Sequence, residues 1–179
     1  LKKKIHSKND HQDEEKHFKP REFGVFIFNK GNRIIARQLD SDPYVKIDHK
    51  WFTEKLEKAK NKRDLFFQQP FYRLVNGESD GIPGVNIDRY NDIISIVINC
   101  SGMANGFLLR PLIKAIEDVI DPKCIIFRHD SSILKVAQNE NGTKPKESKQ
   151  IEIYKGVYTE LTHLLENNVT HVIDLVKGT

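Results

Sequence analysis

Cysteine is scarce in this sequence of 179 residues, which has only Cys100 and Cys124. Two cysteines are too few for a disulfide framework, and they lack the spacing of metal ligands. Each lies in an apolar, strand-like run, where a cysteine is expected to be a small core residue. The seven histidines are scattered without ligand pairs, so we expect no metal. A reducing compartment, cytoplasmic or organellar, is the default expectation.

Long apolar runs are also absent. No segment approaches the roughly 20 apolar residues that a membrane-spanning helix needs, so no membrane partner is expected. Residues 1–20 are polar, with no apolar segment after the lysines, and do not predict a secretory signal. The chain is 38% hydrophobic, enough to bury a core, and its length suits one domain or a small domain beside a partial one.

Charge of one sign is only slightly in excess, because 29 Lys+Arg stand against 25 Asp+Glu and leave a net charge of +4. Such mild basicity permits nucleic-acid binding without establishing it. Basic residues are concentrated in the segments 2–4, 50–63 and 144–149. Each segment is either a solvated surface or a contact for phosphate.

Hydrophobic periodicity predicts strands and helices in mixed order. Residues 25–28 and 33–39 are expected to form a hairpin, which is too small to bury itself. A helix over 47–66 is predicted from Asp48 as N-cap and from apolar positions at helical spacing. These positions are Trp51, Phe52, Leu56, Ala59 and Phe66.

The rest of the chain continues this mixture. Apolar runs predict strands at 72–75, 85–88, 93–99, 124–127, 151–154 and 170–176. An amphipathic helix is predicted at 107–120 and a short helix at 131–137. Because strands outnumber helices, the predicted fold class is α+β, with helices packed on one face of a mainly antiparallel sheet.

The run YRLVNGESDGIPGVNIDRY, residues 72–90, holds three turns that need glycine and asparagine for backbone reasons alone. Its GIPG segment is no phosphate loop, since it lacks the Walker lysine and serine. The run closely resembles the start of the central domain in a family of S-adenosylmethionine (SAM)-dependent RNA methyltransferases. That family includes the bacterial enzymes that methylate C5 of cytosine in large-subunit ribosomal RNA (rRNA). The agreeing positions are Asn76, Glu78, Ser79-Asp80-Gly81, Pro83-Gly84 and Asp88-Arg89-Tyr90.

The resemblance implies a PUA β-barrel, then a central domain, then a catalytic Rossmann-like domain. It divides the chain into a tail or diverged PUA start (1–23), a PUA-like hairpin region (24–47), a linker helix (48–66) and the central α+β domain (67–179). For the full-length protein it implies SAM as cofactor and RNA, in particular rRNA, as partner. A homodimer is left open.

The final segment, VIDLVKGT, permits two interpretations. It could open a SAM loop, although Val176 stands where a first glycine would let the backbone approach the cofactor. The family instead ends its central domain in a hairpin, which Glu166-Asn167-Asn168 and Asp174 fit better. Under either interpretation the SAM pocket is incomplete, so this fragment alone is expected to be inactive and not to bind SAM.

Methylation of cytosine C5 needs a thiolate that attacks C6. Neither cysteine lies in a Pro-Cys or similar activating context, so no catalytic residue is assigned in this chain. The candidate RNA-binding residues are Arg33, Arg37, Lys46, Lys50 and Lys55. A second group of polar motif residues is expected to face a cleft for a flipped base. This group is Arg73, Asn76, Glu78, Asp80 and Arg89.

Three alternatives remain open. The motif residues could be structural, with Asp80 and Asn76 bonding their own turns and Arg73 pairing with Glu78 or Asp88. The protein could be a non-catalytic RNA-binding or assembly module. It could also be a protein-interaction module that uses the apolar helix 107–120. Salt separates the last two, because binding to RNA weakens steeply with salt and apolar association does not.

Overall fold

The computed structural model describes residues 23–29, 33–128, 151–158, 161–166 and 169–176. The elements, in chain order, are β1 (Val25–Phe28), β2 (Ala36–Asp40), α1 (His49–Asp64), β3 (Phe71–Asn76), the 3₁₀ helix η1 (Gly77–Asp80), β4 (Val85–Tyr90), β5 (Ile93–Ile98), α2 (Gly106–Ile120), β6 (Cys124–Arg128), β7 (Ile151–Lys155), β8 (Thr162–Glu166) and β9 (Val169–Ile173). The helix expected at 131–137, the basic segments 2–4 and 144–149 and nearly all of residues 1–23 lie outside the described residues.

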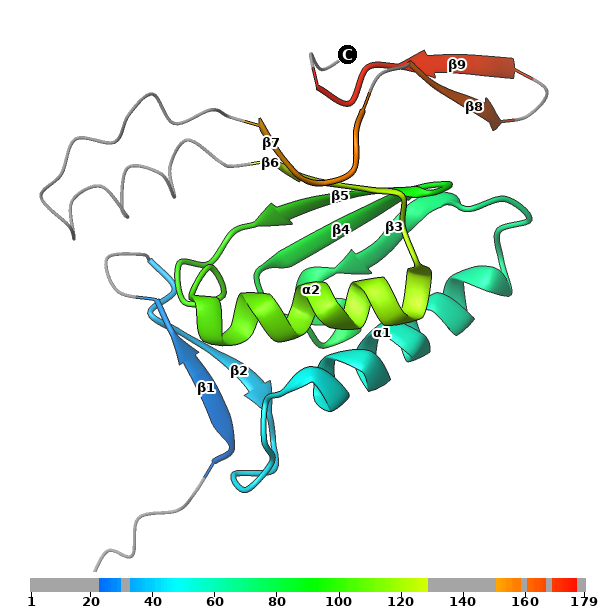
Figure 1. The fold of residues 1–179 in the computed structure, drawn as a ribbon. Coiled ribbons are helices and arrows are strands. Elements are labelled where there is room, and N and C mark those ends of the chain that lie inside the picture. Colours follow the sequence, from blue (N-terminus) through cyan, green and yellow to red (C-terminus); the bar gives the residue numbers. More distant parts are fainter. Residues whose placement is uncertain (1–22, 30–32, 129–150, 159–160, 167–168, 177–179) are drawn as a thin grey trace, which may run out of the picture.

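A five-stranded sheet with the order β3-β4-β5-β6-β7 forms the centre of the molecule. Its neighbours are antiparallel except for β5 and β6, which are parallel and are joined through α2. A parallel pair needs such a crossover because the chain must return to the same end of the sheet. Both helices lie on one face of the sheet (Figure 1). The predicted α+β class, with helices on one face of a mainly antiparallel sheet, is confirmed.

Helix α1 begins where the sequence predicts it. The side chain of Asp48 accepts a hydrogen bond from the backbone N–H of Trp51 at 3.2 Å, which satisfies one of the free donors of the first turn. The apolar face of α1 is buried and consists of Trp51, Phe52, Leu56 and Ala59. The helix packs against α2 and β3. Phe66 was expected on this face, and that prediction is wrong. Phe66 follows the helix end and is 76% exposed.

Helix α2 carries a more continuous apolar face. Leu112, Ile113, Ala115 and Ile116 are buried in the same core as α1. Phe107 was assigned to this face but is 87% exposed, because it lies in the first turn, where Asn105 caps the helix. The four buried residues of this face pack within the chain, and the protein-interaction alternative is not tested by this packing.

The hairpin of β1 and β2 is attached to the core by apolar contacts and to α1 by a polar contact. Ile27 and Leu39 are part of the main core, and the Trp51 indole N–H donates to the Asp40 carboxylate at 2.8 Å. The second strand was expected to begin at Arg33, which is wrong. It begins at Ala36.

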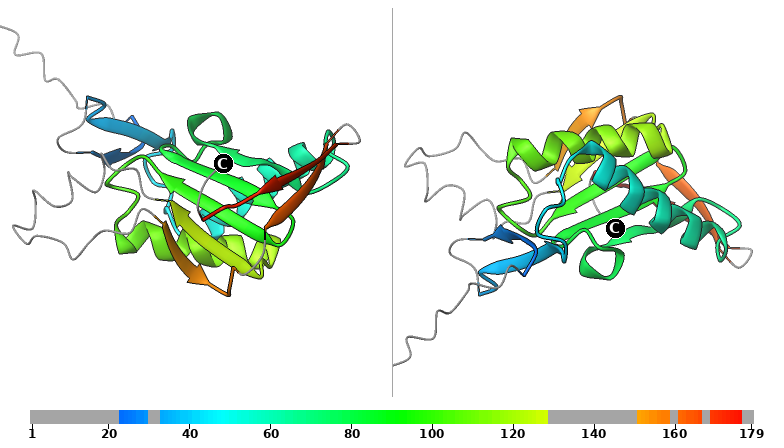
Figure 2. Two further views of the ribbon diagram at one scale, coloured as in Figure 1. Left: turned by 90° about the horizontal axis from the view of Figure 1, so that it is seen from above. Right: turned by 90° about the horizontal axis from the view of Figure 1, so that it is seen from below.

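A third sheet consists of β8 and β9, which pair antiparallel from Thr162↔Ile173 to Glu166↔Val169. The predicted C-terminal hairpin is therefore confirmed. Its second strand ends at Ile173 rather than at Val176, because the Asp174 carboxylate accepts from the N–H of Val176 at 2.9 Å and forms a turn. Figure 2 shows the β1-β2 and β8-β9 hairpins at opposite ends of the central sheet. No helix in the described part of the chain is long and apolar enough to cross a membrane.

Candidate nucleic-acid interface

The run 72–90 forms the β3-η1-β4 unit at one edge of the sheet. Its turns favour glycine at three positions, because Gly77, Gly81 and Gly84 have φ values of +51°, +75° and +73°. At Gly84 a side chain is also excluded by packing, since an added Cβ would lie 2.6 Å from the Cβ of Cys100. The glycines of the run therefore shape the backbone.

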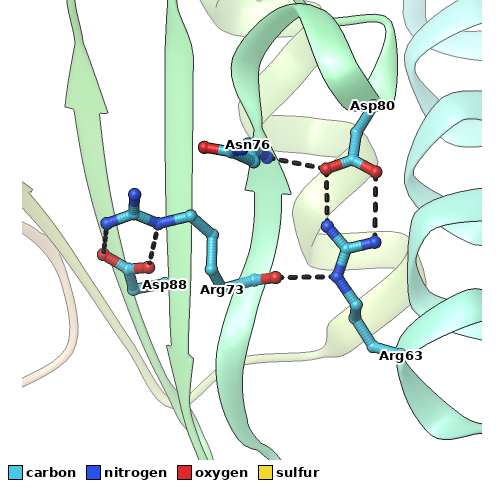
Figure 3. A network of polar contacts seen from close by, with 5 residues as sticks. All are labelled: Arg63, Arg73, Asn76, Asp80 and Asp88. Atoms are coloured by element: carbon cyan, nitrogen blue, oxygen red, sulfur yellow. Dashed lines mark hydrogen bonds and ion pairs between the residues drawn. The ribbon is translucent and has the colours of Figure 1, made fainter. Parts of the chain in front are cut away.

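A buried ion pair joins this unit to α1 (Figure 3). The Arg63 guanidinium donates to both carboxylate oxygens of Asp80, at 3.1 and 2.6 Å. The side chains are 13% and 4% exposed, respectively. Arg63 also donates to the Arg73 carbonyl at 2.9 Å, and Asp80 accepts from the Asn76 N–H at 2.8 Å. These four hydrogen bonds fix the position of η1 against the C-terminal half of α1.

The other charged motif residues also have internal partners. Arg73 and Asp88, which face each other on β3 and β4, form two hydrogen bonds at 2.8 and 3.2 Å. The bonds to Asp88 raise the pKa of Arg73. Arg89 donates to the Tyr72 hydroxyl at 3.2 Å. The interpretation in which Asp80 and Asn76 bond their own turn and Arg73 pairs with Asp88 agrees with this geometry. A role in base recognition stays a prediction.

The five candidate RNA-binding residues have unequal surroundings. Arg37 forms an ion pair with Glu78 that links β2 to η1, and its side chain is largely buried. Lys46 and Lys50 are exposed and lie 3.7 Å from Asp48 and 3.9 Å from Glu54, respectively. Arg33 is exposed. The structure thus forms an ion pair between one residue of each predicted group, Arg37 and Glu78.

Lys55, the fifth candidate, is held in place. Its ammonium lies 5.0 Å from the centre of the Trp51 ring and 3.9 Å from Asp40. Its side chain also lies against Gly81, where an added Cβ would come within 3.3 Å. Lys55 is therefore positioned over the turn that the motif forms.

A cleft of about 290 Å³ separates α1 from the turn after β3. We call it the lysine cleft. Its lining residues are Lys55, Lys58, Ala59, Lys62, Glu78, Ser79, Asp80 and Gly81. The lysines at positions i, i+3 and i+7 share one side of the helix. The basic segment 50–63 contains Lys58 and Lys62, but neither is among the five candidate RNA-binding residues. The available signal was their spacing from Lys55.

Neither cysteine can act as a nucleophile in this conformation. Both are buried and free. Burial raises the pKa of the Cys124 thiol, which disfavours the reactive thiolate.

The described residues do not fit a SAM site at the C-terminal segment. A SAM loop needs glycine backbone that approaches the cofactor, whereas Asp174 binds its own turn and Leu175 is buried. Nor does the described part of the chain contain a group of three or more His, Cys, Asp or Glu residues that could hold a metal ion.

Comparison with known proteins adds relatives that cover part of the chain. No protein-family model matches it. The chain is 33% identical over 112 residues, 60% of its length, to ribosomal RNA large subunit methyltransferase I of Escherichia coli O1:K1 / APEC. It is likewise 33% identical over 108 residues to the protein of the same name from Cronobacter sakazakii.

Two solved structures have a similar fold. One is assigned as a SAM-dependent methyltransferase from Streptococcus mutans, with a TM-score of 0.68, 19% identity and 87% of this chain covered. The other is assigned as a methyltransferase complexed with SAH, with a TM-score of 0.69, 18% identity and 88% covered. The chain spans 28% of the E. coli relative and 38% and 37% of the two solved chains. It is thus similar in sequence to part of large-subunit rRNA methyltransferases and shares a fold with part of two chains assigned as methyltransferases.

Proposed function

We propose that this chain is the N-terminal, substrate-handling part of a SAM-dependent methyltransferase that modifies cytosine C5 in large-subunit rRNA. The observation that carries the proposal is its 33% identity over 112 residues to ribosomal RNA large subunit methyltransferase I. The unusual run 72–90 supports the same assignment, because it resembles the start of the central domain of such enzymes. In this proposal residues 24–47 are part of a PUA-like unit, 48–66 a linker helix and 67–179 the central domain.

The chemistry is assigned to residues outside the described part of the chain. Cytosine C5 becomes nucleophilic only after a thiolate adds to C6, and both cysteines of this chain are buried. The methyl donor is assigned to a separate catalytic domain, because the described residues do not fit SAM. What remains for this chain is to bind and orient the RNA.

The proposed RNA contacts are electrostatic. Lysine and arginine side chains that neutralise phosphates contribute affinity that depends on salt and little on sequence. The candidate surface consists of Arg33, Lys46, Lys50 and Lys55, and Lys55 also lines the lysine cleft. Arg37 is assigned the different task of holding the hairpin against η1, since it is already paired with Glu78.

Methyl transfer by the natural protein that contains this chain tests the proposal. The protein is incubated with labelled SAM and unmodified large-subunit rRNA, and the product nucleosides are identified by mass spectrometry. We expect 5-methylcytidine. A different methylated nucleoside would contradict cytosine C5 as the target but would still support methyl transfer to RNA as the activity. No incorporation into any rRNA would favour a non-catalytic RNA-binding module.

The 179-residue chain alone provides the matching control. Titration calorimetry with SAM is expected to detect no binding, because the donor site is proposed to lie elsewhere. Measurable binding would contradict the assignment of the donor site to a separate domain.

A further inference from the structure

We propose that the lysine cleft binds phosphate groups of an RNA backbone, with Lys58 and Lys62 as the main contacts and Lys55 as the third. The inference rests on the RNA partner proposed above and assigns that partner a surface. This surface differs from the one that the sequence predicts, since the five candidate RNA-binding residues do not include Lys58 or Lys62.

The charges of the cleft favour an anion because its two carboxylates are already neutralised. Glu78 is paired with Arg37, and Asp80 is paired with Arg63 through two hydrogen bonds. Neither arginine lines the cleft. Each carboxylate therefore has a cationic partner that does not line the cleft, so the positive charge of Lys58 and Lys62 is left for a ligand.

Lys58 and Lys62 are the lysines of α1 best suited to a ligand. Both are exposed, and no described residue forms an ion pair with either of them. Two other lysines of the helix are engaged, Lys60 with Asp64 at 2.6 Å and Lys50 with Glu54 at 3.9 Å. A phosphate that binds at Lys58 and Lys62 therefore does not have to displace an internal carboxylate.

Lys55 adds a pre-positioned charge to the cleft lining, and its ammonium also lies 3.9 Å from Asp40. It packs over Trp51 and against Gly81, which limits the rotamers that its side chain can adopt. Less conformational entropy is then lost when it binds a ligand than for a free surface lysine. The absence of a Cβ at Gly81 leaves room for both the lysine and the cleft.

The dimensions suit a polymer backbone. The cleft has a volume of about 290 Å³ and opens to solvent, so an extended chain can lie across it without entering a closed cavity. Positions 55 and 62 are about 10 Å apart along the helix axis, at 1.5 Å per residue. That span exceeds the rise of about 3.4 Å between neighbouring phosphates of a stacked strand, so the lysines can contact more than one phosphate.

The lining also favours a nucleic acid over an acidic protein. Protein interfaces depend on large apolar or aromatic anchors at their centre. Among the described residues, Ala59 supplies the only apolar side chain of the cleft lining. A basic groove without such an anchor matches the charge-dominated contacts that proteins make with nucleic-acid backbones.

The test compares two double variants that remove the same charge from the 179-residue chain. Lys58→Gln/Lys62→Gln changes the cleft, and Arg110→Gln/Lys114→Gln changes two exposed basic residues of α2 with which no described residue forms an ion pair. Binding of a fluorescent single-stranded RNA copied from large-subunit rRNA is followed by anisotropy over a range of salt concentrations. Circular dichroism verifies that each variant is folded.

Three lysine contacts predict a slope of log affinity against log salt of about −2, at about 0.7 per contact for a single strand. Loss of two contacts should make the slope less negative by about 1.4 and lower RNA affinity at about 0.1 M salt by roughly 25-fold. The RNA affinity of the control variant should fall by about threefold or less, because charges farther from the bound RNA than the Debye length are screened. Equal losses of RNA affinity in both variants would overturn the proposal that the cleft binds RNA, since binding would then depend only on total charge.

The remaining outcomes separate this inference from the proposed function. No binding of RNA by the wild-type chain at low salt would overturn both. RNA binding that is unchanged in the cleft variant but weakened by Lys46→Gln/Lys50→Gln would overturn the cleft as the binding site. The proposal that RNA is the partner would still stand. Inorganic phosphate that competes with RNA as well as unlabelled RNA does would indicate a site for a free anion, and would overturn the backbone assignment.

Discussion

Replacement of Asp80 by asparagine tests the most buried charge in the candidate interface. Asparagine has nearly the same volume and can still accept from the Asn76 N–H, but its amide nitrogen cannot accept from Arg63. The Arg63 guanidinium would then remain buried with part of its charge uncompensated. Loss of one partner of a buried ion pair costs about 3–5 kcal/mol, so Asp80→Asn should lower the free energy of unfolding by about 3 kcal/mol. Domains of this size have about 5–15 kcal/mol in total.

The measurement is urea denaturation followed by fluorescence. Trp51 is the only tryptophan and is buried in α1, so its emission reports the loss of this core. Asp88→Asn is the matched control, because it breaks the ion pair of Arg73, whose side chain is 51% exposed. An exposed pair contributes about 1 kcal/mol or less. Equal losses for Asp80→Asn and Asp88→Asn would show that burial of the Arg63 pair does not determine its contribution.

Three further predictions concern the backbone, pH and the thiols. Gly84→Ala should lower the free energy of unfolding by about 2–4 kcal/mol, because the new side chain strains the backbone and overlaps with Cys100. Gly106→Ala is the control and should not destabilise the chain, because its Cβ would meet nothing closer than 4.0 Å. Similar urea midpoints for the two variants would refute the packing argument. The pKa of Asp40 is lowered, chiefly by the hydrogen bond from Trp51, so its contribution to stability is present above its ordinary pKa of about 3.9 and is lost as pH falls below it. Urea midpoints measured against pH should fall less steeply below about pH 4 for Asp40→Asn than for the wild type, and parallel curves would contradict this assignment. Because both cysteines are buried, a thiol reagent should modify the native chain far more slowly than the urea-unfolded chain, and equal rates would show that they are accessible.

Much of the local structure could be predicted from the sequence because it depends on neighbouring residues. The cap at Asp48, the helical spacing from Trp51 to Ala59 and the turn glycines each act over a few positions along the chain. Helix periodicity failed at Phe66 because it does not report where a helix stops. In the structure the N–H groups of Phe66 and Phe67 both bond the carbonyl of Arg63, which ends the helix and turns Phe66 outward.

The charges of the candidate site could not be predicted in the same way. The partners Arg37 and Glu78 are 41 residues apart, and Arg63 and Asp80 are 17 residues apart. Such pairs form only after α1, η1 and the β1-β2 hairpin have packed against one another, since opposite charges interact strongly over a few ångströms. Composition and spacing therefore determined the elements, the α+β class and a basic helix. Tertiary packing decided which charges are neutralised and which lysines face an open cleft.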